Sequence, residues 1–128
     1  MPAQKVVLAG DKDASEVLEA DLRASGVEAR FHPADGLVEA LQSIERELEG
    51  NRPDAAVAVG TGAASLALAI TAGKLGVPLA ACLGGAASGD EDKRRILATL
   101  ASLQVGPDSG DAANRIASWL GEDRVIRL

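Results

Sequence analysis

Aromatic residues are almost missing from this chain of 128 residues: Phe31 and Trp119 are the only two, and there is no tyrosine. Apolar residues still make up 47% of the chain, so aliphatic side chains must fill the interior. With Ala, Val, Leu and Ile in that role, we expect helices and sheet to pack closely through small side chains. The length suits a single domain, and we expect residues 1–128 to form one.

An excess of positive charge is also missing, since the formal net charge is −6. A nucleic-acid partner is not expected, because binding to phosphates relies on a basic surface that releases counterions. The same negative charge argues against binding to an anionic membrane surface. No run of about 20 apolar residues is long enough to span a bilayer, and the first residues show no signal-peptide pattern. The one cysteine cannot form an internal disulfide, so we expect a cytoplasmic protein.

Groups of metal ligands and nucleophilic triads are lacking as well. The chain has one histidine, His32, and one cysteine, Cys82, which lie far apart in sequence and do not make a zinc site. No Ser-His-Asp or Cys-His arrangement is supported. We therefore expect no metal, no cofactor and no catalytic residue. His32, which precedes Pro33 in a loop, is interpreted as a surface group, and Cys82 as a small hydrophobic residue.

What the chain does have is a regular alternation of strand and helix patterns. The continuous apolar run Ala55–Val59 indicates a buried parallel strand, and Leu37–Leu48 carries one apolar stripe at helical spacing. The alternation predicts a doubly wound, mainly parallel α/β sheet, Rossmann-like or flavodoxin-like, with five or six strands and helices on both faces. The expected strands are 5–10, 27–31, 55–59, 77–82, 103–106 and 124–128, in the order 2-1-3-4-5-6. The expected helices are 15–25, 37–48, 63–75, 90–103 and 111–120.

Glycine-rich loops follow the first and third expected strands. Sheets of this type bind ligands beyond the carboxyl ends of their strands, where the strand order reverses, which is here between Gly10 and Gly60. In the segment Gly60-Thr-Gly-Ala-Ala-Ser65, small residues would let an anion approach the N–H groups of the next helix. Thr61 and Ser65 add hydroxyls, Gly62 adds open backbone, and Lys12 adds a cation after Gly10. The alternative is that these segments are tight or solvated turns whose small residues only permit packing.

A series of short motifs from Pro53 onward follows the order found in one known family. They are Pro53-Asp54, the apolar strand with Gly60 after it, Gly76-Val-Pro-Leu79, Ser88-Gly89-Asp90, Arg94, 101–107 and 122–126. In order and spacing they resemble the N-terminal domain of the non-hydrolysing UDP-N-acetylglucosamine 2-epimerases, which has a glycosyltransferase-B-like Rossmann fold. The resemblance covers about three-fifths of the chain. It implies that Ser88 belongs to the ligand site and that the domain associates with a second copy.

Departures from the family concern its chemistry. Thr61 stands where the family has an Asp, Leu83 where it has a catalytic Glu, and Lys12 where it has an Arg. Glu91 aligns with the family's second Glu, although the loop before it is shorter. The C-terminal domain, which holds most of the family's nucleotide contacts, has no counterpart here. Because epimerisation needs acid/base groups beside the sugar, these departures imply a pseudoenzyme.

A second, shorter resemblance is to the ribose-5-phosphate isomerases of type B, which carry Gly-Thr-Gly after their third strand, as Gly60-Thr-Gly62 does here. Their catalytic Cys is replaced by Val59, and the Asp-His of their first loop reads Asp11-Lys12. This resemblance implies a single sugar-phosphate-binding domain, and its chemistry is also missing.

Three functions follow. The first is a non-catalytic, epimerase-like binding module or subunit for a small anionic ligand such as a nucleotide, nucleotide sugar or sugar phosphate. The second is a small sugar-phosphate or nucleotide-sugar enzyme whose site is rebuilt around Lys12, Thr61, Ser65 and Glu91. The third is a structural self-association domain.

Self-association has support in the sequence of one helix. Residues 63–75 leave almost no polar face apart from Thr71 and Lys74. The next helix offers further apolar side chains, which are Ile96, Leu97, Leu100 and Leu103. We therefore expect a homodimer. The alternative is that the last helix of the same chain, near Trp119, covers the apolar surplus.

Overall fold

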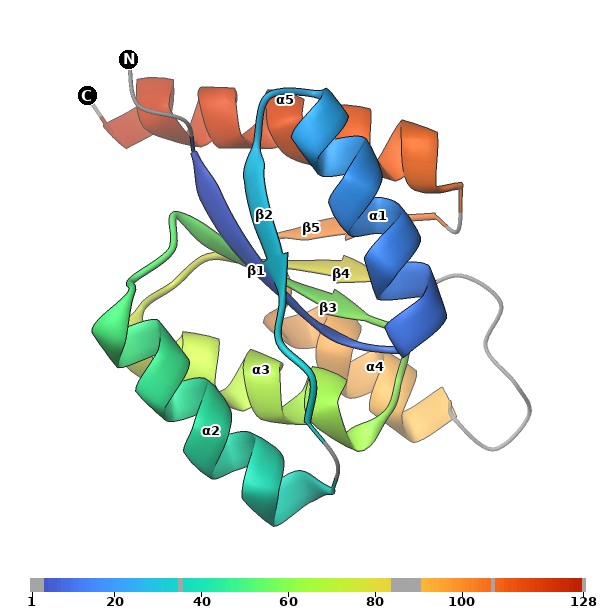
Figure 1. The fold of residues 1–128 in the computed structure, drawn as a ribbon, viewed down its shortest axis with the longest axis vertical. Coiled ribbons are helices and arrows are strands. Elements are labelled where there is room, and N and C mark those ends of the chain that lie inside the picture. The colour runs from blue at the N-terminus through green and yellow to red at the C-terminus, as the bar shows by residue number, and fades with distance from the viewer. Residues whose placement is uncertain (1–3, 35, 84–90, 107, 128) are drawn as a thin grey trace.

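One five-stranded parallel sheet with helices on both faces forms the protein (Figure 1). The computed structural model describes residues 4–34, 36–83, 91–106 and 108–127. The strands are β1 (Lys5–Gly10), β2 (Glu28–Phe31), β3 (Ala55–Val59), β4 (Leu79–Cys82) and β5 (Leu103–Val105). The helices are α1 (Lys12–Ala24), α2 (Leu37–Gly50), α3 (Ala63–Leu75), α4 (Glu91–Leu100) and α5 (Ser109–Arg127). The fold is Rossmann-like, as the alternating pattern predicts.

The strand order is β2-β1-β3-β4-β5, so the expected reversal between the first and third strands is confirmed. Every pairing in the sheet is parallel. Parallel neighbours need a crossover connection, and the helices between the strands supply it. All five residues of β3, in the centre of the sheet, are buried. At the edge, β2 alternates between exposed and buried residues, as its sequence predicts.

Helices cover both faces of the sheet (Figure 1), and beneath them lie two separate cores, one on each face. Alternate residues of β1 and β3, such as Val7 and Ala56, pack under α2, α3 and α4. The residues between them, such as Leu8 and Val57, pack under α1 and α5. This period of two is the geometry of a strand, whose successive side chains point to opposite faces. Small side chains dominate both cores, which is how a chain with two aromatic residues fills its interior.

The apolar helix α3 lies between α2 and α4, and α5 covers the opposite face of the sheet. The alternative that the last helix covers α3 is therefore wrong. Most of α3 is buried, including Leu68 and Ala72. On its outer side, Lys74 Nζ lies 2.9 Å from Glu45 Oε1 of α2. The hydrogen bond and charge of Lys74 lower the pKa of Glu45, and Glu45 in turn raises the pKa of Lys74.

The end of the chain departs from expectation, because the strand predicted at residues 124–128 is absent. Instead α5 continues from Ser109 to Arg127. A helix already under way gains one hydrogen bond for each residue that it adds, so a short apolar stretch joins it more easily than it starts a strand. Gly121 alone does not stop it. The helix expected at 90–103 is also shorter and ends at Leu100, because Leu103 begins β5. No helix within the described ranges is long and apolar enough to cross a membrane.

Candidate functional site

The carboxyl ends of β1 and β3 lie side by side, because Gly10 pairs with Val59 in the sheet register. From this point the chain leaves β1 for α1 and leaves β3 for α3, and these helices cover opposite faces. We call the segments 10–12 and 60–65 together the switch-point loops. The fold therefore brings together Gly10 and Gly60, the two glycines that the sequence places at the reversal of strand order.

The backbone carbonyl of Val59 holds the switch-point loops together. Its oxygen accepts a hydrogen bond from the Asp11 N–H, with N···O 2.9 Å, and one from the Ser65 hydroxyl, with O···O 2.8 Å. Gly10 lies against the Val59 carbonyl and the Ser65 hydroxyl, and its φ is +131°. A Cβ at Gly10 would stand 2.0 Å from the Val59 oxygen and 2.4 Å from Ser65 Oγ. Only glycine fits at this position.

The N-terminus of α3 has no side-chain cap among the described residues. Its N-cap residue is Gly62. The first N–H groups of a helix have no acceptor within that helix, and they carry the positive end of its dipole. A Cβ at Gly62 would meet no described atom within 4 Å, so the backbone here is accessible. By contrast, α1 is capped by the Asp11 carboxylate, which accepts a hydrogen bond from the Ala14 N–H at 2.9 Å.

The remaining candidate residues take different places around this site. Lys12 is exposed on the first turn of α1, and Thr61 is half-buried in the loop before α3. Ser65 is fully buried, and its hydroxyl is directed to Val59 rather than outward. Glu91 is exposed and begins α4, which follows β4. Ser88 lies outside the described residues.

Asp11 is the residue that the sequence reasoning missed as part of the site's architecture. Its side chain caps α1, and its N–H binds Val59, so it fixes both loops at once. The signal in the sequence was an Asp at N-cap distance before a helix. Leu83, which stands where the epimerase family has a carboxylate, has a side chain only 5% exposed and packs in the core under α3.

The side chains of His32 and Cys82 both have partners away from the switch-point loops, although the Cys82 carbonyl accepts from the Gly60 N–H. His32 Nε2 lies 3.0 Å from Ser43 Oγ of α2, so this ring is half-buried rather than a free surface group. Cys82 Sγ lies 3.3 Å from the Gly106 carbonyl oxygen. Across the described part of the chain, no three His, Cys, Asp or Glu side chains gather where they could hold a metal ion.

Comparison with known proteins identifies the fold through solved structures, whereas no family model and no curated protein matches the sequence. A UDP co-structure of MnaA from S. aureus is 15% identical over 90% of this chain, with a TM-score of 0.65. The UDP-GlcNAc 2-epimerase of Methanocaldococcus jannaschii is 17% identical over 91%, with a TM-score of 0.66. The NanR protein of Vibrio vulnificus, complexed with ManNAc-6P, is 20% identical over 98%, with a TM-score of 0.54.

This chain spans less than half of each of these proteins: 40% of MnaA, 42% of the archaeal epimerase and 48% of NanR. The match therefore concerns a portion of each relative. Further epimerases, from Neisseria meningitidis and Listeria monocytogenes, give TM-scores of 0.62 and 0.64 over 91% of this chain. The chain has the fold of one part of the UDP-N-acetylglucosamine 2-epimerases, in agreement with the resemblance that its sequence motifs carry.

Proposed function

We propose that the protein is a non-catalytic binding module that takes a small phosphate-bearing ligand at the switch-point loops. The observation that carries the proposal is the N-terminus of α3, where no side chain of the described residues caps the first N–H groups and no described atom crowds Gly62. An anion placed there would meet both the helix dipole and the hydrogen-bond donors. The adjacent end of β1 closes one side of the site and is fixed in place by Val59, Asp11 and Ser65.

The relatives narrow the chemistry of the ligand. Their solved complexes contain UDP, UDP-GlcNAc and ManNAc-6P. These molecules share a phosphate group joined to a sugar. We therefore propose that this chain binds a nucleotide, a nucleotide sugar or a sugar phosphate. Lys12 supplies an exposed cation at the same edge, and Thr61 supplies a hydroxyl. Ser65 supports the wall of the site from behind, and we propose Glu91, the first residue of α4, for its outer margin.

A thermal-shift series tests the proposal. We expect UDP, UDP-GlcNAc or ManNAc-6-phosphate at millimolar concentration to raise the unfolding temperature, because a ligand that binds only the folded state stabilises it by mass action. At a ligand concentration of 100 times Kd, the gain is about 2.7 kcal/mol. UDP and inorganic phosphate in parallel separate recognition of the base from recognition of phosphate alone. Unchanged unfolding temperatures with every compound would contradict the proposal.

Catalysis is not expected from the same site. Thr61 cannot act as a carboxylate in proton transfer, and Leu83 is apolar and buried in the core. We predict no conversion of UDP-GlcNAc to its 2-epimer by the isolated chain, as measured by sugar analysis after prolonged incubation at high protein concentration. Glu91 is the one carboxylate aligned with the family's acidic positions. Turnover that disappears in Glu91→Gln would show that a rebuilt active site exists.

A homodimer is a separate proposal, and it rests on exposed apolar side chains of α3 and α4. Ile70 is 50% exposed on α3, while Ile96 and Leu100 are 50% and 47% exposed on α4, which packs beside α3. Leu97 and Leu103, expected in this patch, lie elsewhere: Leu97 is buried in the core, and Leu103 begins β5. We propose that Ile70, Ile96 and Leu100 together make an apolar patch, which a two-fold axis could bury against its copy.

Light scattering at micromolar concentration tests the homodimer. We predict a dimer mass for the parent chain and a monomer mass for Ile70→Glu, because the substitution buries an unpaired carboxylate in the interface. The matched control is Val17→Glu, which replaces an exposed apolar residue of α1 on the opposite face of the sheet. A monomer mass for the parent chain would reject the proposal, and so would a dimer that withstands Ile70→Glu.

A further inference from the structure

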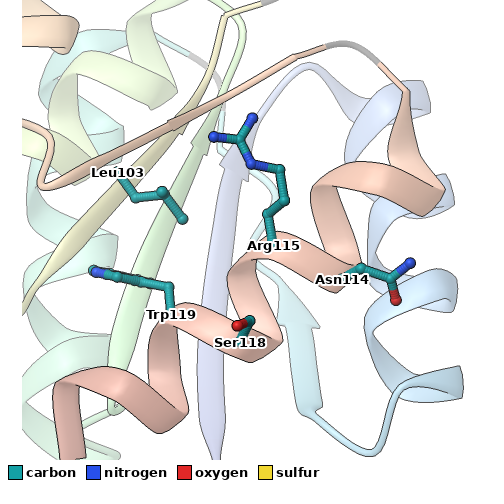
Figure 2. A pocket seen from close by; sticks show the side chains of 5 residues that line it. All are labelled: Leu103, Asn114, Arg115, Ser118 and Trp119. Atoms are coloured by element: carbon teal, nitrogen blue, oxygen red, sulfur yellow. The ribbon is translucent and has the colours of Figure 1, made fainter.

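A second hollow, distinct from the switch-point loops, lies between β5 and α5 (Figure 2). Its volume is about 320 Å³, near the lower end of the range for small-molecule sites. Its lining consists of Leu103 from β5 and four residues of α5, which are Asn114, Arg115, Ser118 and Trp119. Arg115 and Trp119 are one helical turn apart, and Figure 2 shows both side chains on the side of Leu103. We call this hollow the Trp119 pocket.

The Trp119 pocket lies toward the amino ends of the strands, away from the switch-point loops. Leu103 is the first residue of β5. Leu120, next to Trp119, is also near the start of β1, because the Gln4 side-chain amide donates to the Leu120 carbonyl oxygen at 3.4 Å. Gly10 and Gly60 stand at the opposite, carboxyl ends of their strands. A ligand in this pocket would therefore occupy a site independent of the proposed function.

The Trp119 pocket contains a tryptophan and an arginine whose side chains have no other assigned role in the described structure. Trp119 is the only tryptophan of the chain, and it is half-buried at the margin of the core rather than inside it. Arg115 is exposed and makes no ion pair with any described residue, whereas Arg23 and Arg30 both do. Tryptophan and arginine are, with tyrosine, the residue types enriched among the binding hot spots of protein–protein interfaces.

We infer that the Trp119 pocket binds a small molecule that combines a planar ring with a carboxylate or phosphate group. The flat indole of Trp119 offers a stacking surface for a ring, and Leu103 extends the apolar wall. The Arg115 guanidinium is a planar fork of donors that matches a carboxylate or phosphate. The Ser118 hydroxyl and Asn114 amide stand at the margin for further hydrogen bonds. A cationic ligand is disfavoured, since the guanidinium would repel it.

Intrinsic fluorescence tests this inference directly, because a chain with one tryptophan and no tyrosine reports only on Trp119. The protein is the Gly62→Val variant, in which we expect weaker binding at the switch-point loops, and the probes are benzoate and uridine monophosphate. Inorganic phosphate and acetate serve as anions without a ring. We expect a saturable change in emission with at least one ring-bearing anion and none with the other two. A carboxylate-only or phosphate-only response identifies which class the pocket takes.

Arg115→Gln should weaken this binding by about tenfold or more, because it removes a charge-assisted hydrogen bond and leaves a shorter, neutral side chain. The matched control, Arg46→Gln on α2, removes an exposed charge on the other face of the sheet and should leave the affinity unchanged. The inference is overturned by the absence of any saturable change at millimolar probe. It is equally overturned if Arg115→Gln binds like Arg46→Gln, or if phosphate or acetate alone gives the same response.

Discussion

Gly10→Ala should destabilise the folded state by about 3 kcal/mol or more, the range of severe substitutions with a defined steric cause. The new Cβ would lie 2.0 Å from the Val59 carbonyl oxygen, far inside any tolerated contact. That oxygen cannot move freely, because it accepts hydrogen bonds from Asp11 and Ser65. The φ of +131° is also one that side-chain-bearing residues rarely adopt. Urea unfolding followed by circular dichroism measures the loss.

Gly36→Ala is the matched control for this substitution. Gly36 also has a positive φ, of +75°, but a Cβ there would meet no described atom within 4 Å. It isolates the backbone cost, which is on the order of 1–3 kcal/mol here, because φ of +75° with ψ of 155° is a conformation populated almost only by glycine. The difference between the two variants is then the cost of the close approach between β1 and β3. Equal losses would mean that the strand ends are not held as tightly as the distances indicate.

Gly62→Val should weaken the binding of any phosphate-bearing ligand at the switch-point loops by at least about tenfold, or 1.4 kcal/mol. The valine side chain would fill the open space beside the helix N-terminus, where the anion must approach the backbone. The fold should tolerate the change, because Gly62 has a φ of −75° and no close neighbours among the described atoms. Calorimetric titration of parent and variant with the ligand found by thermal shift measures the effect.

Gly62→Ala controls for the loss of glycine itself, since its single methyl group leaves more of the space open. We expect its affinity to fall between those of the parent and Gly62→Val. Exchange of the N-cap glycine for valine carries a helix-capping cost of about 1 kcal/mol, so the stability of each variant is measured beside its affinity. An unchanged affinity in Gly62→Val would mean that the ligand binds at another part of the molecule.

Much of the fold was predictable because local patterns and tertiary environment agree. Ala55–Val59 is apolar throughout and becomes the central strand, and Ala63–Leu75 has the helix boundaries that the sequence predicts. Parallel strands with short connections leave few topologies, so the position of the switch point followed from the alternation alone. The failure at residues 124–128 has a different cause. A short, partly apolar segment has no strand preference strong enough to resist extension of the helix before it.

The candidate site was predictable in position and less so in detail. The glycines of both loops were identified because small residues after strands mark this edge of the sheet. The direction of a hydroxyl is not evident from residue types. Ser65 donates to the carbonyl of Val59, six residues earlier, because the turn from β3 into α3 brings the two together, and the residue types of that turn do not reveal its geometry. The partner of His32, Ser43, is set by the packing of α2 and not by any motif.

Backbone amide chemical shifts of the labelled protein, titrated with UDP, UDP-GlcNAc and ManNAc-6-phosphate, test the central claim most directly. The claim is that a phosphate-bearing ligand sits at the N-terminus of α3 beside the end of β1. We predict that the amide signals of residues 60–65 move furthest, that those of 10–12 move with them, and that all follow one saturation curve. Saturable shifts that leave residues 60–65 unchanged would contradict the account, as would the absence of shifts with all three compounds.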